Sequence, residues 1–204
     1  MEMNYKEIDE INDFNVDVKV GEDCEAKIIK DFRPIFTPIL SRIYYKENPA
    51  LQKTGCDGFV QPQQIPYDIK CRRFVDFKYI GVDILLETIS NIERNKPGWV
   101  YYTKSPIVAY FWLNISMSGF LDGYILYMDE IRKFFVGNEN KYHRPRPATS
   151  HRNGTIWHTE NRIVEIEQFP IGSIQHISKD AFTPKEQLLL SKFFKGFVPS
   201  ACPK

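Results

Sequence analysis

Residue types alternate over residues 67–71 (Tyr-Asp-Ile-Lys-Cys), and this stretch constrains the fold more than any other part of the sequence. In a β-strand, successive side chains point to opposite faces, so Asp68 and Lys70 share one face while their apolar neighbours share the other. Asp57 lies upstream, and the residues between Asp57 and Asp68 include two prolines. The pattern predicts a strand, a loop and a returning antiparallel strand that places Asp57 against the face carrying Asp68 and Lys70.

Two carboxylates and one ammonium group on a shared face suit metal-assisted hydrolysis of a phosphodiester. Mg²⁺ binds oxygen ligands, commonly one or two carboxylates together with water and substrate phosphate. Asp57 and Asp68 are therefore candidate ligands for Mg²⁺ or Mn²⁺. Lys70 is the candidate for orienting or deprotonating the attacking water, or for stabilising charge that develops on the phosphate. The alternative is that the acid-X-lysine tripeptide is only a solvated strand face.

The composition fits a single soluble domain. The chain has 204 residues, of which 43% are hydrophobic, enough for one sizeable core. The net charge of +1 means that any contact with DNA depends on a local basic patch. The four cysteines have no C-x-x-C spacing, which argues against structural zinc and a secreted disulfide framework and favours a reducing cytoplasm. No apolar run approaches the ~20 residues that span a bilayer, so we expect no membrane partner.

Asp57 and residues 68–70 resemble the signature of the PD-(D/E)XK nuclease superfamily, in which an acid is followed, after a gap, by acid-X-lysine on the next strand. Residues 83–101 are similar to the acid-bearing third strand and Gly-Trp segment of phage and mobile-element members. Residues 21–25 resemble the start of the first helix of resolvase-like nucleases. The resemblance implies an α+β (α/β) fold with a restriction-endonuclease-like core, in which helices flank a central mixed β-sheet.

Two glutamates are further candidates for the site. Glu25 lies on the apolar stripe of a helix predicted at residues 22–32, and in related nucleases a first-helix glutamate reaches the metal. The alternative is that Glu25 lies at the edge of this stripe and is solvated. Glu87 lies in a strand predicted at residues 83–91, which is apolar on both faces and therefore central. Glu87 either pairs with Lys70 or an arginine, or makes an accessory contact to metal or water.

Hydrophobic patterns predict the remaining elements. The continuous apolar run at residues 107–113 is typical of a strand covered on both faces, and we expect it to be the fourth core strand. Residues 99–102 are expected to form a compact turn, because the connection between these strands is too short for a long crossover helix. Further strands are predicted at residues 121–128 and 162–169, and helices at 129–136 and 183–195. We divide the chain into an arm (1–20), a nuclease-like core (21–115) and an extension packed on the same domain (116–204).

Basic residues near predicted strand ends and in the polar segment 138–154 are candidate nucleic-acid contacts. We expect this segment to be a loop, because it has no core-forming residues. Arginine and lysine side chains supply contacts to phosphate. The alternative is that these residues are merely solvated. The candidates are Arg72, Arg73, Lys78, Arg144, Arg146 and Arg152.

Together these features predict a Mg²⁺- or Mn²⁺-dependent deoxyribonuclease, an endonuclease of restriction, repair or phage genome processing. DNA is the expected partner, the cytoplasm is the expected location, and a homodimer is left open. One alternative is a nuclease-fold protein without catalysis that binds DNA or serves in assembly. Another is a viral structural or interaction protein in which the three charged residues coincide by chance.

Overall fold

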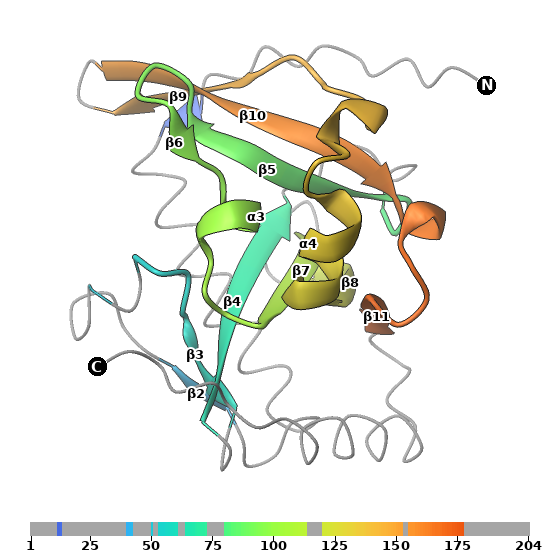
Figure 1. Ribbon diagram of the computed structural model, residues 1–204. Coiled ribbons are helices and arrows are strands. Elements are labelled where there is room, and N and C mark those ends of the chain that lie inside the picture. Colours follow the sequence, from blue (N-terminus) through green and yellow to red (C-terminus); the bar gives the residue numbers. More distant parts are fainter. Residues whose placement is uncertain are drawn as a thin grey trace.

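The computed structural model describes residues 12–13, 40–42, 50, 53–60, 64–72, 80–113, 120–152 and 155–177. Within these residues the fold is of the α+β kind, dominated by two mixed β-sheets with few helices (Figure 1). The first sheet, here the β4 sheet, carries the predicted hairpin. The second, here the β5 sheet, lies across it. The described strands divide between two sheets and do not form one central sheet.

The β4 sheet contains the hairpin predicted from the sequence. Its strand order is β11-β8-β7-β4-β3-β2. β3 and β4 pair antiparallel, with Gly58 opposite Tyr67, and β4 pairs parallel with β7, with Asp68 opposite Val108. The bounds are β2 (Leu40–Arg42), β3 (Gly58–Val60), β4 (Ile65–Arg72), β7 (Ile107–Leu113), β8 (Phe120–Tyr127) and β11 (Ile174–Ile177).

The β5 sheet contains the predicted third strand, but not where it was expected. Its order is β1-β9-β10-β5-β6. Residues 83–91 form β5, which lies between β10 and β6 and does not pair with β4, so the predicted central strand belongs to a different sheet from the Lys70 strand. The bounds are β1 (Asn12–Asp13), β5 (Asp83–Asn91), β6 (Lys96–Pro97), β9 (Ala148–Arg152) and β10 (Thr155–Glu165).

Two segments of the C-terminal half depart from the sequence prediction. Residues 148–152 were expected in a loop but form β9, which pairs with β10 so that Arg152 faces Thr155. The Asn-Gly pair between these strands is a strong hairpin signal. The strand predicted at residues 162–169 begins earlier and ends at Glu165. There a capping box between Glu165 and Gln168 starts the 3-10 helix η3 (Ile166–Gln168).

The described helices are short. α4 (Met128–Phe135) confirms the helix predicted at residues 129–136, and α3 (Trp99–Tyr102) is the expected compact turn. A 3-10 helix, η2 (Glu139–Lys141), follows α4. The helices predicted at residues 22–32 and 183–195 lie outside the described residues. No helix in the described part of the chain is long and apolar enough to cross a membrane.

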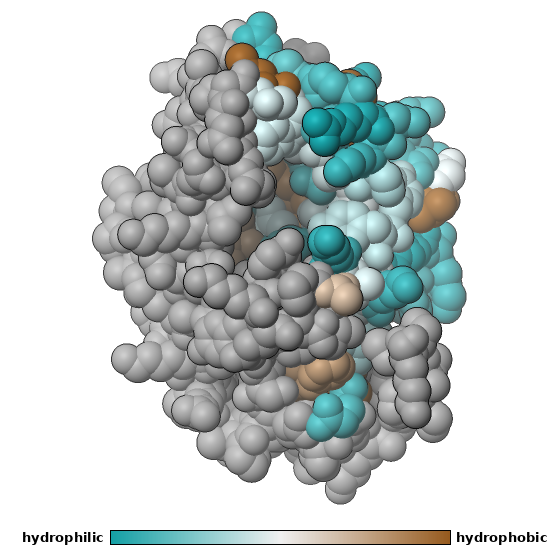
Figure 2. All heavy atoms as spheres, turned by 90° about the vertical axis from the view of Figure 1, so that its left-hand side faces the viewer, coloured by the Kyte–Doolittle hydropathy of each residue, from teal (hydrophilic) through white to brown (hydrophobic). Residues whose placement is uncertain are grey.

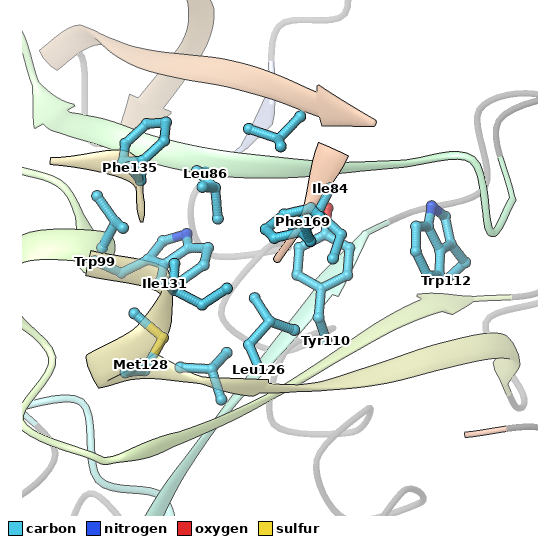
Figure 3. Close-up of a cluster of buried hydrophobic side chains, with 13 residues drawn as sticks. Ile84, Leu86, Trp99, Tyr110, Trp112, Leu126, Met128, Ile131, Phe135 and Phe169 are labelled. Carbon is cyan, nitrogen blue, oxygen red and sulfur yellow. The ribbon is translucent and has the colours of Figure 1, made fainter. Parts of the chain in front are cut away.

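The main hydrophobic core lies between the two sheets, where side chains of β5 face those of β7, β8 and α4 (Figure 3). β7 is covered on both faces as predicted. Val108, Tyr110 and Trp112 belong to this core, while Ile107 and Phe111 are buried on the other face. Burial on both sides explains why β7 has a continuous apolar run rather than an alternating one.

One buried ion pair joins the two sheets. Arg72, at the end of β4, binds the carboxylate of Asp83, at the start of β5; Asp83 is fully buried, and only 9% of the Arg72 side chain is exposed.

The cysteines also differ from the expectation of a reduced protein. Cys56 is a buried thiol that donates to the Gly58 carbonyl at 3.5 Å, but Cys71 is disulfide-bonded.

Candidate active site

The hairpin of β3 and β4 brings Asp57 close to Asp68. The paired register ends with Gly58 opposite Tyr67, and Asp57 directly precedes Gly58. The Asp57 N–H donates to the Tyr67 carbonyl at 2.8 Å, and the Asp57 carboxylate accepts from the Ile69 N–H at 2.6 Å. The Asp57 side chain thus replaces a backbone partner just before β3 begins. Like charges placed close together repel, so this pair has a cost that a cation or proton would relieve.

Asp68 and Lys70 form the ion pair that the strand period predicts. Lys70 Nζ lies 2.7 Å from Asp68 Oδ1; Asp68 is fully buried, while 27% of the Lys70 side chain is exposed. The second oxygen, Asp68 Oδ2, is buried and has no hydrogen-bond partner in the described part of the chain. A buried polar atom without a partner costs free energy, so Oδ2 marks a place where a bound cation or a proton would be stabilised.

The charges at the site act strongly on one another. Burial raises the pKa of Asp68; Lys70 opposes this rise and the Asp57 carboxylate adds to it. Burial by itself would lower the pKa of Lys70, but the charge of Asp68, with contributions from Tyr102 and Asp57, raises that pKa above its ordinary value. Lys70 is therefore an ammonium ion at every physiological pH, whereas Asp68 holds a proton more readily than an exposed aspartate does.

Gly55 forms one wall of the site. Its φ of +72° lies in the left-handed region, and a Cβ there would lie 2.9 Å from Asp68 Oδ2 and closer still to the Thr103 side chain. The Gly55 carbonyl accepts hydrogen bonds from Thr103 Oγ1 at 3.0 Å and from Ser105 Oγ at 2.5 Å. The residues that follow α3 are thereby held against the aspartate pair, at an approach that only glycine permits.

Gly98 brings α3 against β5 at Glu87. A Cβ on Gly98 would collide with the backbone carbonyl of Glu87, and the Trp99 N–H donates to Glu87 Oε1 at 3.2 Å. Burial raises the pKa of Glu87, while Lys70 and the Trp99 N–H oppose that rise. Glu87 therefore lies in the electrostatic field of Lys70, although its strand belongs to the other sheet.

Tyr102 is a site residue that the sequence did not identify. Its pKa is raised by burial; Lys70 opposes this rise, and the carboxylates of Asp68, Glu87 and Asp57 add to it, so Tyr102 interacts with all four charged groups. The residue remains 38% exposed. The available signal was its place shortly after the Gly-Trp pair, but nothing in the sequence shows that this turn faces β4.

The described residues contain an aspartate pair rather than a complete set of metal ligands. No three histidine, cysteine, aspartate or glutamate side chains converge within them. The predicted third ligand, Glu25, lies outside the described residues. Asp57 and Asp68 alone match the usual protein contribution to a Mg²⁺ site, where water and phosphate supply the other ligands.

The described candidate nucleic-acid contacts lie in separate elements: β4, the segment before β9, and β9. Arg72 is buried against Asp83, with a structural role between the sheets. Arg144 binds Glu160 at 2.5 Å, with 52% of its side chain exposed. Arg146 is exposed in the segment before β9, and Arg152 ends β9. Arg73 and Lys78 lie outside the described residues.

The face that carries α3, β3 and β6, at the left of Figure 1, is mainly hydrophilic in its described part. Figure 2 shows this face directly, with a hollow near its middle where more deeply placed atoms are visible.

No family model and no curated protein matches this chain.

Proposed function

We propose that this chain is a metal-dependent nuclease of the PD-(D/E)XK type that hydrolyses phosphodiester bonds in DNA. One observation carries the proposal. Two neighbouring buried aspartates lie beside a lysine, and one aspartate oxygen has no partner among the described residues. A solvated strand face would not bury Asp68 completely or leave a carboxylate oxygen unsatisfied.

The residues fit a hard divalent cation. Asp57 and Asp68 would hold Mg²⁺ or Mn²⁺ through carboxylate oxygens, and the unpartnered Asp68 Oδ2 is the atom best suited to it. A bound cation supplies Lewis-acid polarisation of the phosphate and lowers the pKa of bound water. Because both aspartates are fixed, one by the Ile69 N–H and the other by Lys70, little reorganisation is required on binding.

Of the roles that the sequence predicts for Lys70, two fit the site best: orienting the attacking water and stabilising charge on the phosphate. In the metal-free protein Asp68 raises the pKa of Lys70, which favours an ammonium that orients groups over a general base. It orients the attacking water or phosphate and stabilises negative charge that develops on the phosphate oxygens. Glu87, held by the Trp99 N–H, adds its own charge to the field around Lys70.

The biological role that we propose is the one predicted from the sequence. An endonuclease of restriction, repair or phage genome processing fits the site, with Arg146, Arg152, Arg73 and Lys78 as phosphate contacts. Arg144 contributes less, because Glu160 already neutralises it. The cytoplasm is the expected location, although the disulfide at Cys71 counts against a strongly reducing compartment.

Plasmid cleavage tests the proposal. The purified chain is incubated with supercoiled and linear DNA in Mg²⁺, in Mn²⁺ and in EDTA, and compared with Asp68→Asn. We expect nicking or linearisation that requires the metal and is abolished in Asp68→Asn, whose amide keeps the side-chain shape but is a far weaker cation ligand.

Asp129→Asn is the matched control, because Asp129 is an exposed aspartate on α4. It should cleave as the parent does. Full activity of Asp68→Asn would exclude the proposed site. DNA binding without cleavage in either metal would instead favour the alternative of a nuclease-fold protein that binds DNA only.

A further inference from the structure

Tyr102 lies where two fixed contacts of α3 converge on the site. On one side of it, the Trp99 N–H binds Glu87; on the other, the Thr103 hydroxyl binds the Gly55 carbonyl beside Asp68. Arg132 of α4 holds the same turn by donating to the carbonyls of Val100 and Thr103. The backbone of Tyr102 is therefore held between β5 and the aspartate pair.

The neighbouring Tyr101 provides a direct contrast. The two residues are almost equally exposed, at 37% and 38%. The Tyr101 hydroxyl donates to Glu139 Oε1 at 2.7 Å. Within the described part of the chain the Tyr102 hydroxyl donates to no protein acceptor, although it lies in the field of Lys70 and three carboxylates. Tyr101 is satisfied by the fold, and Tyr102 is left with a donor at the rim of the site.

We infer that Tyr102 is a substrate-contacting residue whose hydroxyl donates a hydrogen bond to a phosphate oxygen of the bound nucleic-acid strand. This inference rests on the proposed function, because it takes the site to be one for phosphodiesters. A neutral phenol among carboxylates does not repel an anion as they do, and its O–H can donate to a phosphate oxygen. A phenol is protonated near neutral pH, so Tyr102 is suited to donate to phosphate.

The rim position determines which kinetic constant the contact affects. Tyr102 is partly exposed, whereas Asp68 is completely buried, so the hydroxyl meets the strand beside the reacting group. A contact made equally in the ground state and in the transition state lowers KM without raising kcat. A hydrogen bond to a charged partner corresponds to about 10- to 100-fold in affinity.

The test compares Tyr102→Phe with Tyr101→Phe. Each variant loses one hydroxyl and keeps its ring, so packing and any base stacking are retained. For Tyr102→Phe we expect KM for DNA to rise about 10-fold or more with kcat changed less than about threefold. Tyr101→Phe should leave both constants unchanged. Unchanged kinetics in Tyr102→Phe, an equal loss in both variants, or a loss confined to kcat would overturn the inference.

A binding measurement separates this inference from the nuclease proposal. Fluorescence anisotropy with a labelled DNA duplex in Ca²⁺, and with its single strand, gives Kd without turnover. Tyr102→Phe should weaken binding while leaving the salt dependence unchanged, because a neutral hydroxyl releases no counterions. Weakened binding in a chain that never cleaves would uphold the contact and reject the nuclease. Unchanged Kd in a chain that cleaves would do the reverse.

Discussion

β4 carries two ion pairs on one face, and they differ in how completely they are satisfied. Lys70 binds Asp68 within its own strand, and Arg72 binds Asp83 from the other sheet. Both aspartates are fully buried. Asp68 keeps an unpartnered oxygen, whereas neither Arg72 nor Asp83 contains such a buried atom. The pair of Arg72 and Asp83 thus joins the two sheets. In the pair of Lys70 and Asp68, one carboxylate oxygen can still accept a bond.

The largest expected effect comes from breaking the arginine pair. Asp83→Asn leaves a buried guanidinium without its charge partner, which costs about 3–5 kcal/mol in the free energy of unfolding. For a chain of this length we expect Tm to fall by about 10 °C or more. Urea and thermal unfolding measure the change.

Asp129→Asn is the control for that loss, because Asp129 forms only a surface contact with Arg132 at 3.8 Å. Its effect should stay within about 0.5 kcal/mol. A comparable loss in both variants would contradict the structural role given to the pair of Arg72 and Asp83.

Lys70→Met should lower the cleavage rate about 10²- to 10³-fold, since it removes a donor for charge that develops in the transition state. Metal affinity should persist, because the cation is held by carboxylates. Calorimetric titration with Mn²⁺ measures that affinity directly.

Lys133→Met is the matched control, because Lys133 forms an ion pair of the same 2.7 Å length with Glu130 on the surface of α4. It should leave cleavage unchanged. If Lys70→Met lost metal affinity as fully as Asp68→Asn, the role assigned to Lys70 would be wrong.

Glu87→Gln should change how the thermal stability of the protein depends on pH. Burial raises the folded-state pKa of Glu87 above the ordinary value for a glutamate. The stability that this group contributes is therefore present below the unfolded pKa and is lost as pH rises through the folded pKa. We expect Glu87→Gln to have the higher Tm at alkaline pH, where the parent carboxyl is ionised, and the two proteins to converge at acidic pH.

Glu93→Gln should show the opposite pH dependence. His158 lowers the pKa of Glu93 to about 2, so that carboxylate stabilises the fold above its unfolded pKa and the benefit is lost as pH falls through the folded value. Thermal unfolding across pH tests both variants. Parallel Tm curves for Glu87→Gln and the parent would show that burial does not destabilise the charged form of Glu87.

The smallest effect concerns the basic segment. If Arg144, Arg146 and Arg152 bind phosphate, replacing all three with alanine should weaken DNA binding equally for every sequence, and the log-log salt slope should fall by about 0.9 for each phosphate that is no longer neutralised. Arg144→Ala alone should change the slope by less than a full phosphate contact, because Arg144 is bound to Glu160. A parental slope in the triple variant would remove this segment from the DNA path.

Local periodicity predicted much of this fold. The two-residue period of β4 placed Asp68 and Lys70 together, and the apolar run of β7 predicted burial on both faces. α4 was placed to within one residue at each end. These features depend on neighbouring residues in sequence, so the sequence contains enough to predict them.

Pairing between distant segments was not predictable in the same way. An apolar pattern identifies β5 as a strand but does not specify β10 as its neighbour. The position of Tyr102 depends on the close approach of Gly98 to Glu87, which leaves no periodic signal. The sequence predicted Arg72 as a phosphate contact or a solvated residue at a strand end, and only the packing of the two sheets shows that Asp83 neutralises it.

The parallel pairing of β4 with β7 determines the order in which the site can be assembled. The hairpin that brings Asp57 close to Asp68 closes a short loop and can form early, whereas a parallel pair needs a long crossover, and here that crossover contains β5, β6 and α3. Closing it is the slower event. During biosynthesis the two aspartates of the hairpin therefore come together before Glu87 and Tyr102 are brought to them, so under the proposed function the cation site would form before the substrate contact.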